Sequence, residues 1–111
     1  MADCIFCKIA AHEAPATIVH EDEDVVAFED LGHRAPLHVL VIPRRHVASL
    51  AEADAATAGT VAAAAARVAR EAGYAERGYR VVTNVGPDAG QSVPHLHFHV
   101  LAGRPLGWPP G

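Results

Sequence analysis

One twelve-residue segment, from Gly90 to Leu101, constrains the fold of this chain more than any other. It reads GQSVPHLHFHVL, so three of the eight histidines alternate with large apolar residues. Alternation is the period of a β-strand. The segment therefore predicts a strand with His95, His97 and His99 on one face and an apolar face toward the core. With a rise of about 3.3 Å per residue, neighbouring imidazoles on that face would stand about 7 Å apart.

A row of imidazoles backed by an apolar core suits phosphate, metal or proton-transfer chemistry. Rings about 7 Å apart cannot all ligate one zinc ion, whose bonds to nitrogen are about 2.0–2.1 Å long. Two histidines that flank a substrate phosphate fit the spacing better, with His97 attacking and a neighbour donating to the phosphoryl oxygens. The glycine-bearing loop before the strand adds backbone N–H groups for an anion. The alternative to a phosphate site is a hydrogen-bonded histidine cluster that has no catalytic role.

The rest of the chain predicts an α+β domain with about five strands and one long helix. The expected elements besides the histidine strand are a short helix or turn at 4–10, strands at 17–20, 25–29, 37–42 and 79–84, and a helix at 49–72. The helix is expected to start at Ser49, because Ser49 and Glu52 fit a capping box. The strand at 37–42 is almost entirely apolar, so we expect it at the centre of an antiparallel sheet.

Size and charge limit the class of partner. A chain of 111 residues, half of them hydrophobic, fits one domain over residues 1–111. The net charge of −4 argues against a nucleic-acid partner but allows a nucleotide in a closed pocket. No apolar run is long enough for a membrane span, and residues 1–4 lack the pattern of a signal peptide. We therefore expect a cytoplasmic protein with no membrane partner.

The histidine segment resembles the His-x-His-x-His motif of the histidine triad (HIT) superfamily of nucleotide hydrolases and transferases. Other segments resemble its Hint branch, the nucleoside phosphoramidase group. They are GQSV at 90–93, GR at 103–104, WPPG at 108–111, FEDL at 28–31 and APLHVLVIP at 35–43. The resemblance covers the chain from about residue 3 to residue 111. It implies the HIT fold in a single domain, with a five-stranded sheet, one long helix and a short N-terminal helix. It also implies a homodimer in which two sheets join into one of ten strands.

The resemblance implies catalytic roles for five residues. His97 would be the nucleophile and would form a nucleotidyl-histidine intermediate. His99 would hydrogen-bond the α-phosphate, and His38 would support both. The backbone carbonyl of His95 would orient His97, and Ser92 would contact the phosphate and the leaving group.

A nucleotide site is implied around this centre. Asp30 would accept the ribose hydroxyls, which suits a carboxylate with two acceptor oxygens. An apolar wall would enclose a purine base. The further residues implied for the nucleotide site are Ile5, Phe6, Phe28, Leu31, Asn84, Gly90, Gln91, Ser92, Val93, His97, His99 and Trp108. In this branch the C-terminal tail, here with Trp108, reaches toward the partner's active site.

A second constellation involves the only two cysteines, which form a CxxC at Cys4 and Cys7. Together with His46 and His95 they resemble the Cys2His2 structural zinc site of some bacterial members of the superfamily. Such a site would hold the N-terminal segment on the sheet. Two free thiols and a redox pair are the alternatives. Pro94 departs from the family pattern and puts the position of His95 in doubt.

The resemblance implies a hydrolase that converts purine nucleoside 5′-phosphoramidates, and aminoacyl-adenylates, to nucleoside monophosphates without a catalytic metal. Two alternatives are a dinucleoside polyphosphate hydrolase and a non-catalytic AMP-binding sensor. A zinc-dependent deaminase is disfavoured, because the expected His-x-Glu partner of a Pro-Cys-x-x-Cys segment is missing.

Overall fold

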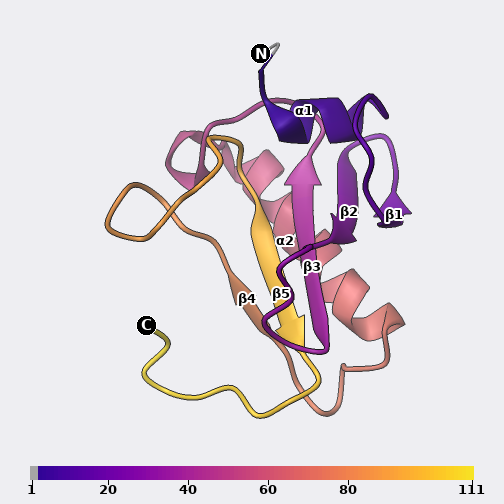
Figure 1. Ribbon diagram of the computed structural model, residues 1–111, viewed down its shortest axis with the longest axis vertical. Helices are drawn as coiled ribbons and strands as arrows, with labels where there is room; N and C mark the ends of the chain where they lie inside the picture. Colours follow the sequence, from indigo (N-terminus) through magenta and orange to yellow (C-terminus); the bar gives the residue numbers. More distant parts are fainter. Residues whose placement is uncertain (1–2) are drawn as a thin grey trace.

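The computed structural model describes residues 3–111 and contains a five-stranded antiparallel sheet of order β1-β2-β3-β5-β4 (Figure 1). The strands are β1 (Ile18–Glu21), β2 (Val25–Glu29), β3 (Leu37–Pro43), β4 (Arg80–Val82) and β5 (Phe98–Ala102). The helical elements are α1 (Ile5–Ala10), the 3₁₀ turn η1 (Leu50–Glu52) and α2 (Ala55–Glu71). The α+β class, the five strands and the two helices predicted from the sequence are confirmed.

β3 occupies the centre of the sheet, as its nearly continuous apolar sequence predicts. Its alternating side chains enter two separate clusters. Val39 and Val41 pack with α2, whereas Leu40 and Ile42 pack with Phe6 and the rest of α1. The sheet therefore has an α2 face and an α1 face. In Figure 1, α2 lies behind the sheet and α1 lies across its upper end.

The long helix begins later than the capping box predicts. The Ser49 hydroxyl accepts a hydrogen bond from the Ala51 N–H at 3.2 Å, but only η1 follows it. Extended backbone at Ala53 (φ −81°, ψ 141°) then interrupts the helix. Asp54 is the N-cap of α2, where its carboxylate accepts from the Thr57 N–H at 2.7 Å. The predicted start at Ser49 is therefore wrong by about one and a half turns.

The histidine segment also differs from the prediction. β5 starts at Phe98, so His95 and His97 precede the strand and only His99 lies in it. The chain before Phe98 is bonded to loops instead of to a strand; the Thr83 hydroxyl, for example, donates to the His97 carbonyl at 2.8 Å. The prediction of one row on one strand face is wrong. The ring centroids of His97 and His99 are 5.2 Å apart, closer than a strand would place them.

The C-terminal segment after Gly103 contains no helix or strand, as expected from its prolines and glycines. Figure 1 shows it running away from the sheet, and the Trp108 side chain is 81% exposed. Within residues 3–111, no helix is long and apolar enough to cross a bilayer. Met1 and Ala2, which enter the expectation about the N-terminus, lie outside the described residues.

Candidate functional site

Three histidines meet on the α1 face of the sheet. His38 comes from β3, His99 from the neighbouring β5, and His97 from the segment just before β5. The ring centroids of His38 and His99 are 5.2 Å apart, as are those of His97 and His99. His38 and His97 are buried and His99 is partly exposed, so the group is open on one side only.

A single hydrogen bond determines which nitrogen of His97 is free. Its Nδ1 lies 2.7 Å from the carbonyl oxygen of His95, which can only accept, so Nδ1 carries the proton. Nε2 of the neutral ring then carries the lone pair. The edge of the Phe6 ring packs against His97, with centroids 5.1 Å apart, and holds the ring in place. His97 thus presents an unprotonated nitrogen, as a nucleophile must.

The protons of His38 and His99 are fixed in the same way. The Arg34 N–H donates to Nδ1 of His38 at 3.0 Å, so His38 carries its proton on Nε2. That N–H faces Nδ1 of His99 at 2.9 Å and a carboxylate oxygen of Asp30 at 3.3 Å. His99 then has its own proton on Nε2 when neutral. Asp30, His38 and His99 are close enough to be considered a metal site, but the central nitrogen donates and does not ligate.

Burial keeps this pair of histidines neutral. Desolvation lowers the pKa of His38, and nearby Asp30 opposes the change only in part. Desolvation also lowers the pKa of His99, followed by the neighbouring His97 and His38 rings. Both rings are therefore uncharged at neutral pH and act through their N–H groups.

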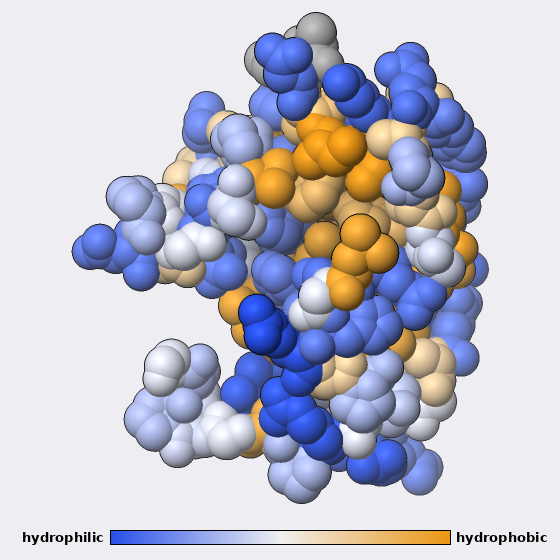
Figure 2. Space-filling model, viewed as in Figure 1, coloured by the Kyte–Doolittle hydropathy of each residue, from blue (hydrophilic) through white to orange (hydrophobic). Residues whose placement is uncertain are grey.

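An apolar pocket adjoins the histidines. Its volume is about 340 Å³, and it lies between α1 and the end of β2. Four of the residues expected to enclose a base line it, namely Ile5, Phe6, Phe28 and Leu31. Asp30 stands at its edge, and the Leu31 side chain is fully exposed beside it. Figure 2 shows hydrophobic surface gathered around α1 on this face.

The loop before β5 is held by Gln91. Its side-chain oxygen accepts from the Gly86 N–H at 3.1 Å, and its amide nitrogen donates to the Ala48 carbonyl at 2.8 Å. These bonds use the polar atoms of Gln91 on the backbone, a role that the sequence interpretation missed. Gly90 turns the loop with a positive φ of 78°, a conformation that glycine adopts without strain.

The remaining expected residues lie around the histidines at different places. Asn84 lines a cavity with His99. Ser92 lines a separate cavity with Cys4, Ile5 and Pro94, and Val93 packs beside the α1 cluster. The exposed Trp108 lines neither cavity. The structure therefore does not bring Ser92 and Trp108 to His99.

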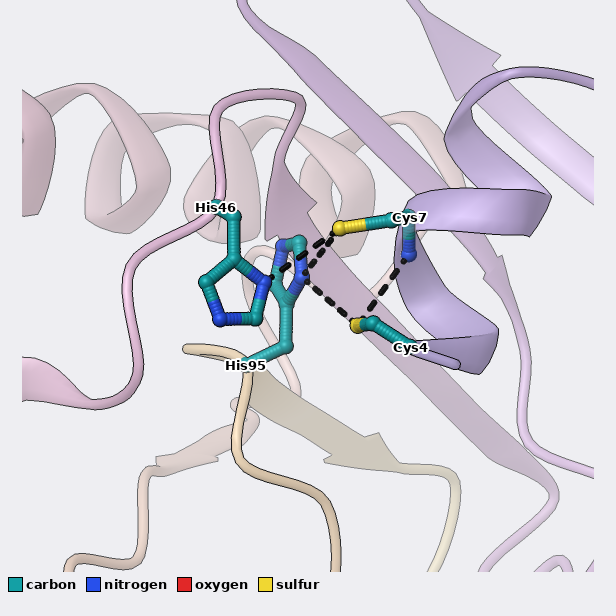
Figure 3. A group of neighbouring side chains, drawn as sticks. All are labelled: Cys4, Cys7, His46 and His95. Atoms are coloured by element: carbon teal, nitrogen blue, oxygen red, sulfur yellow. Dashed lines mark hydrogen bonds between the residues drawn. The ribbon is translucent and has the colours of Figure 1, made fainter. Parts of the chain in front are cut away.

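The two cysteines and two histidines of the second constellation converge (Figure 3). Cys4 is the N-cap of α1 and Cys7 lies in it, whereas His46 comes from the segment after β3 and His95 from the segment before β5. One ligand atom from each lies within 4.8 Å of every other. Pro94 leaves His95 in this position.

The distances fit tetrahedral zinc. With Zn–S bonds of about 2.3 Å and Zn–N bonds of about 2.0–2.1 Å, sulfur and nitrogen ligands lie about 3.5 Å apart. Nδ1 of His95 is 3.3 Å from the Cys4 sulfur and 3.5 Å from the Cys7 sulfur, and Nδ1 of His46 is 3.3 Å from the Cys7 sulfur. Nε2 of His95 donates to the Pro43 carbonyl at 2.9 Å, so Nδ1 is free to ligate.

The surroundings of Cys7 and His95 bear on whether they can ligate a metal. Burial, followed by the neighbouring Cys4 thiol, raises the pKa of Cys7. Desolvation lowers the pKa of His95, which keeps its ring neutral and able to ligate. The sulfur atoms are unpaired thiols at hydrogen-bond distance from imidazoles, and no disulfide joins them. The donor set is that of a closed structural zinc site.

Comparisons with known proteins agree with this arrangement. The family model described as HIT domain matches residues 11–106. The chain is 45% identical to the 14 kDa zinc-binding protein of Zea mays, over 96% of this chain and 87% of that protein. It is 40% identical to the purine nucleoside phosphoramidase of Escherichia coli, over 95% of this chain and 91% of that protein.

A solved structure shares the whole fold. The crystal structure of a HIT family hydrolase from Legionella pneumophila superposes with a TM-score of 0.95. Its sequence is 42% identical to this chain, and the match covers 98% of this chain and 100% of the other. The match therefore spans nearly all of the chain, including the elements that carry both histidine groups.

Proposed function

The chain belongs to the histidine triad family, and from that premise we propose that it is a nucleotide hydrolase of the Hint branch. Its substrates would be purine nucleoside 5′-phosphoramidates, and also aminoacyl-adenylates, with nucleoside monophosphate as the product. The observation that carries the proposal is the free Nε2 of His97, held by the bond from its Nδ1–H to the His95 carbonyl. The relative named purine nucleoside phosphoramidase supports the substrate class.

The proposed reaction has two displacements at the α-phosphorus. In the first, Nε2 of His97 attacks, a P–N bond to His97 forms, and the bond to the leaving amine breaks as that amine takes a proton. In the second, water attacks the phosphorus, its proton is lost, and His97 is released with the nucleoside monophosphate. The His95 carbonyl stabilises the positive charge that develops on the attacking ring, because it accepts from Nδ1–H.

The neighbouring groups would bind the nucleotide. His99 has a ring N–H to donate to the α-phosphate, because its Nδ1 faces His38. Asp30 would accept from the ribose hydroxyls at the edge of the apolar pocket, and Phe6 and Leu31 would cover the base. Asn84 would contact the phosphate from the cavity that it lines with His99. Ser92 lines a separate cavity, and its contact with the phosphate and the leaving group stays a prediction. Trp108 would act from the tail in a dimer.

We also propose that Cys4, Cys7, His46 and His95 hold a structural zinc ion. Bound there, zinc would join α1 to the ends of β3 and β5 and would take no part in the chemical steps. The relative named a zinc-binding protein supports this assignment.

Assembly and location complete the proposal. One HIT domain would span residues 1–111 and form a homodimer in the cytoplasm, without nucleic-acid or membrane partners. β4 lies at the edge of the sheet with β5 as its only neighbour, so a second β4 could pair with it and give ten strands.

Turnover of adenosine 5′-phosphoramidate by purified protein tests the function, with AMP release followed for wild type and His97→Ala. AMP from wild type alone would support the phosphoramidase and its nucleophile together. Full activity in His97→Ala would contradict the mechanism. Absence of AMP from both folded proteins would contradict the function and favour a polyphosphate hydrolase or an AMP sensor.

A further inference from the structure

Cys4 and Cys7 are close enough to react with each other as well as to ligate a metal. The Cys7 N–H donates to the Cys4 sulfur at 3.4 Å, which turns the Cys4 side chain over the first turn of α1. The two sulfurs lie within 4.8 Å of each other, as free thiols (Figure 3). A disulfide joins sulfur atoms about 2.05 Å apart. Rotation of the two side chains and a small movement at the start of α1 would therefore close one.

The cysteine pair lies away from the edge at which the proposed homodimer would form. α1 packs over β2 and β3, through Phe6 and Ile9. β4 is the far edge strand, and β5 separates it from β3 (Figure 1). Both cysteines are partly exposed at the start of α1. A small oxidant can therefore reach their sulfurs without passing the β4 edge.

Different interactions hold the two ends of α1. At the C-terminal end, Nη1 of Arg44 donates to the Ala10 carbonyl at 2.7 Å. At the N-terminal end, the sulfurs of Cys4 and Cys7 lie 3.3 Å from ring nitrogens of the metal cluster. Within residues 3–111, no hydrogen bond from another side chain reaches the first turn of α1. Loss of the cluster would therefore free the N-terminal end of α1 and leave the other end in place.

The free end would be the one that forms the wall of the apolar pocket. Ile5 and Phe6 stand between the two cysteines in the sequence, and both line the pocket of about 340 Å³. The Phe6 ring also packs edge-on against Phe28 and His97, with centroids 5.5 and 5.1 Å apart. A movement at the start of α1 therefore displaces the proposed base-binding wall directly.

The attacking nitrogen is held by other bonds. Nε2 of His95 donates to the Pro43 carbonyl at 2.9 Å, and the His95 carbonyl accepts from Nδ1 of His97 at 2.7 Å. Neither bond involves a sulfur atom. A change at the cysteines is therefore expected to alter nucleotide binding more than the chemical step.

We propose that Cys4 and Cys7 are a peroxide-sensitive pair, and that their oxidation to a disulfide releases the zinc and weakens nucleotide binding. This inference rests on the proposed zinc site and nucleotide pocket. It adds to them a way in which the thiol state of the chain sets its affinity for a nucleotide.

The oxidation has two steps. One metal-bound thiolate attacks hydrogen peroxide, becomes a sulfenic acid and expels hydroxide. The second thiolate attacks that sulfur, the S–S bond forms, and a second hydroxide leaves. The two sulfurs lose two electrons, and the peroxide takes them with two protons to give two waters. Sulfur atoms in a disulfide lack the negative charge of the thiolate ligands, so only two histidines remain for the zinc.

The test treats the zinc-loaded protein with hydrogen peroxide. We expect release of about one zinc per chain to a metallochromic indicator, and an intact mass lower by two hydrogen atoms. AMP affinity in calorimetry should fall about tenfold, the scale of losing part of an apolar wall. Dithiothreitol with added zinc should restore all three values. The chain also has one methionine, but dithiothreitol does not reduce its sulfoxide, so the reversal assigns the effect to the cysteines.

Cys7→Asp is the matched variant, because a carboxylate can ligate zinc and cannot form a disulfide. Whatever its starting value, its AMP affinity should be the same before and after peroxide. If this variant does not fold, the reversal in wild type still decides the question.

Each contrary outcome is separate. Zinc and both thiols retained after peroxide would overturn the reactive pair, as would disulfides formed between chains instead of within one. Zinc release with unchanged AMP affinity would overturn the link to the nucleotide pocket. Failure of the reduced, zinc-loaded protein to bind AMP would contradict the proposed function itself, and this failure is seen before any peroxide is added.

Discussion

His95 and His97 are two residues apart, and each donates a ring N–H to a backbone carbonyl, but through opposite nitrogens. His95 uses Nε2, toward Pro43, and His97 uses Nδ1, toward His95 itself. Nδ1 of His95 is therefore free for the cysteine sulfurs, and Nε2 of His97 is free for a phosphate. A carbonyl acceptor, and not residue type, therefore decides which ring nitrogen each histidine leaves free, and so which proposed role its imidazole can have.

The two regions are nevertheless joined through α1. Cys7 belongs to the Cys4–Cys7–His46–His95 cluster, whereas the adjacent Phe6 packs against His97 and lines the apolar pocket. Because α1 has only six residues, it cannot hold this position by helix formation alone. The Cys4–Cys7–His46–His95 cluster therefore adjoins both one wall of the apolar pocket and the His95 carbonyl that accepts from His97.

The largest expected effect is on turnover, when the proposed nucleophile is removed and the cysteine–histidine cluster is left unchanged. His97→Ala should lower kcat/KM for adenosine 5′-phosphoramidate by about ten-thousand-fold, because the attacking nitrogen is lost. It should keep AMP binding in calorimetry and about one zinc per chain in elemental analysis. Loss of zinc in this variant would show that the two regions are not chemically separate.

The converse variant removes a metal ligand. His46→Ala should lose its zinc and about 2–3 kcal/mol of binding stabilisation, which lowers Tm by about 10 °C. AMP should bind more weakly, because α1 and Phe6 lose their anchor, and the His97 nitrogen should still react. His33→Ala, at an exposed histidine 3.7 Å from Glu29, is the matched control and should retain the metal. A metal-free wild type with the same Tm as the holoprotein would contradict the structural role.

A smaller effect is expected at His38, which supports the reaction from behind His99. His38→Ala removes the donor to Nδ1 of His99 and the acceptor for the Arg34 N–H. Turnover should fall about tenfold, the scale of losing an orienting hydrogen bond. Steady-state kinetics, with zinc content as the control, measures this. An unchanged kcat would show that His99 is oriented by other contacts.

The smallest expected effect is the dependence of thermal stability on pH. The folded-state pKa values of His38 and His99 are lowered by burial, so the unfolded chain binds more protons below about pH 6.5. Their stabilisation is present above pH 6.5 and is lost as the pH falls below it. Tm of His46→Ala, in which metal release cannot contribute, should therefore drop by a few degrees between pH 7.5 and pH 5.5. A Tm that is flat or rises over this range would contradict the neutral histidine pair.

Much of the fold could be predicted from local pattern. The apolar run at 37–42 indicated a central strand, and β3 occupies the centre of the sheet. Convergence of Cys4 with His95 came from the family resemblance, since residues 91 apart in sequence give no local signal. The fold class followed because hairpin-length loops leave few ways to order five strands.

The features that could not be predicted depend on hydrogen bonds to backbone groups, which residue types do not reveal. The sequence pattern could not show that the Arg34 N–H determines which nitrogen of His38 carries the proton. It also could not show that the Gln91 side-chain amide hydrogen-bonds the backbone. It also missed the bend before Phe98, because alternation continues through residues that pair with loops instead of strands. The bonds from Gln91 to Ala48 and from Thr83 to His97 form only once segments distant in sequence are in place.

The most direct test is to find which ring nitrogens of His95 and His97 carry protons. Two-bond ¹H–¹⁵N correlations of the imidazoles, recorded on the zinc-loaded protein at neutral pH, measure this. We predict that His97 carries its proton on Nδ1 with Nε2 unprotonated, and that His95 carries its proton on Nε2 with Nδ1 bound to the metal. His97 protonated on Nε2, or the same tautomer in both rings, would contradict it.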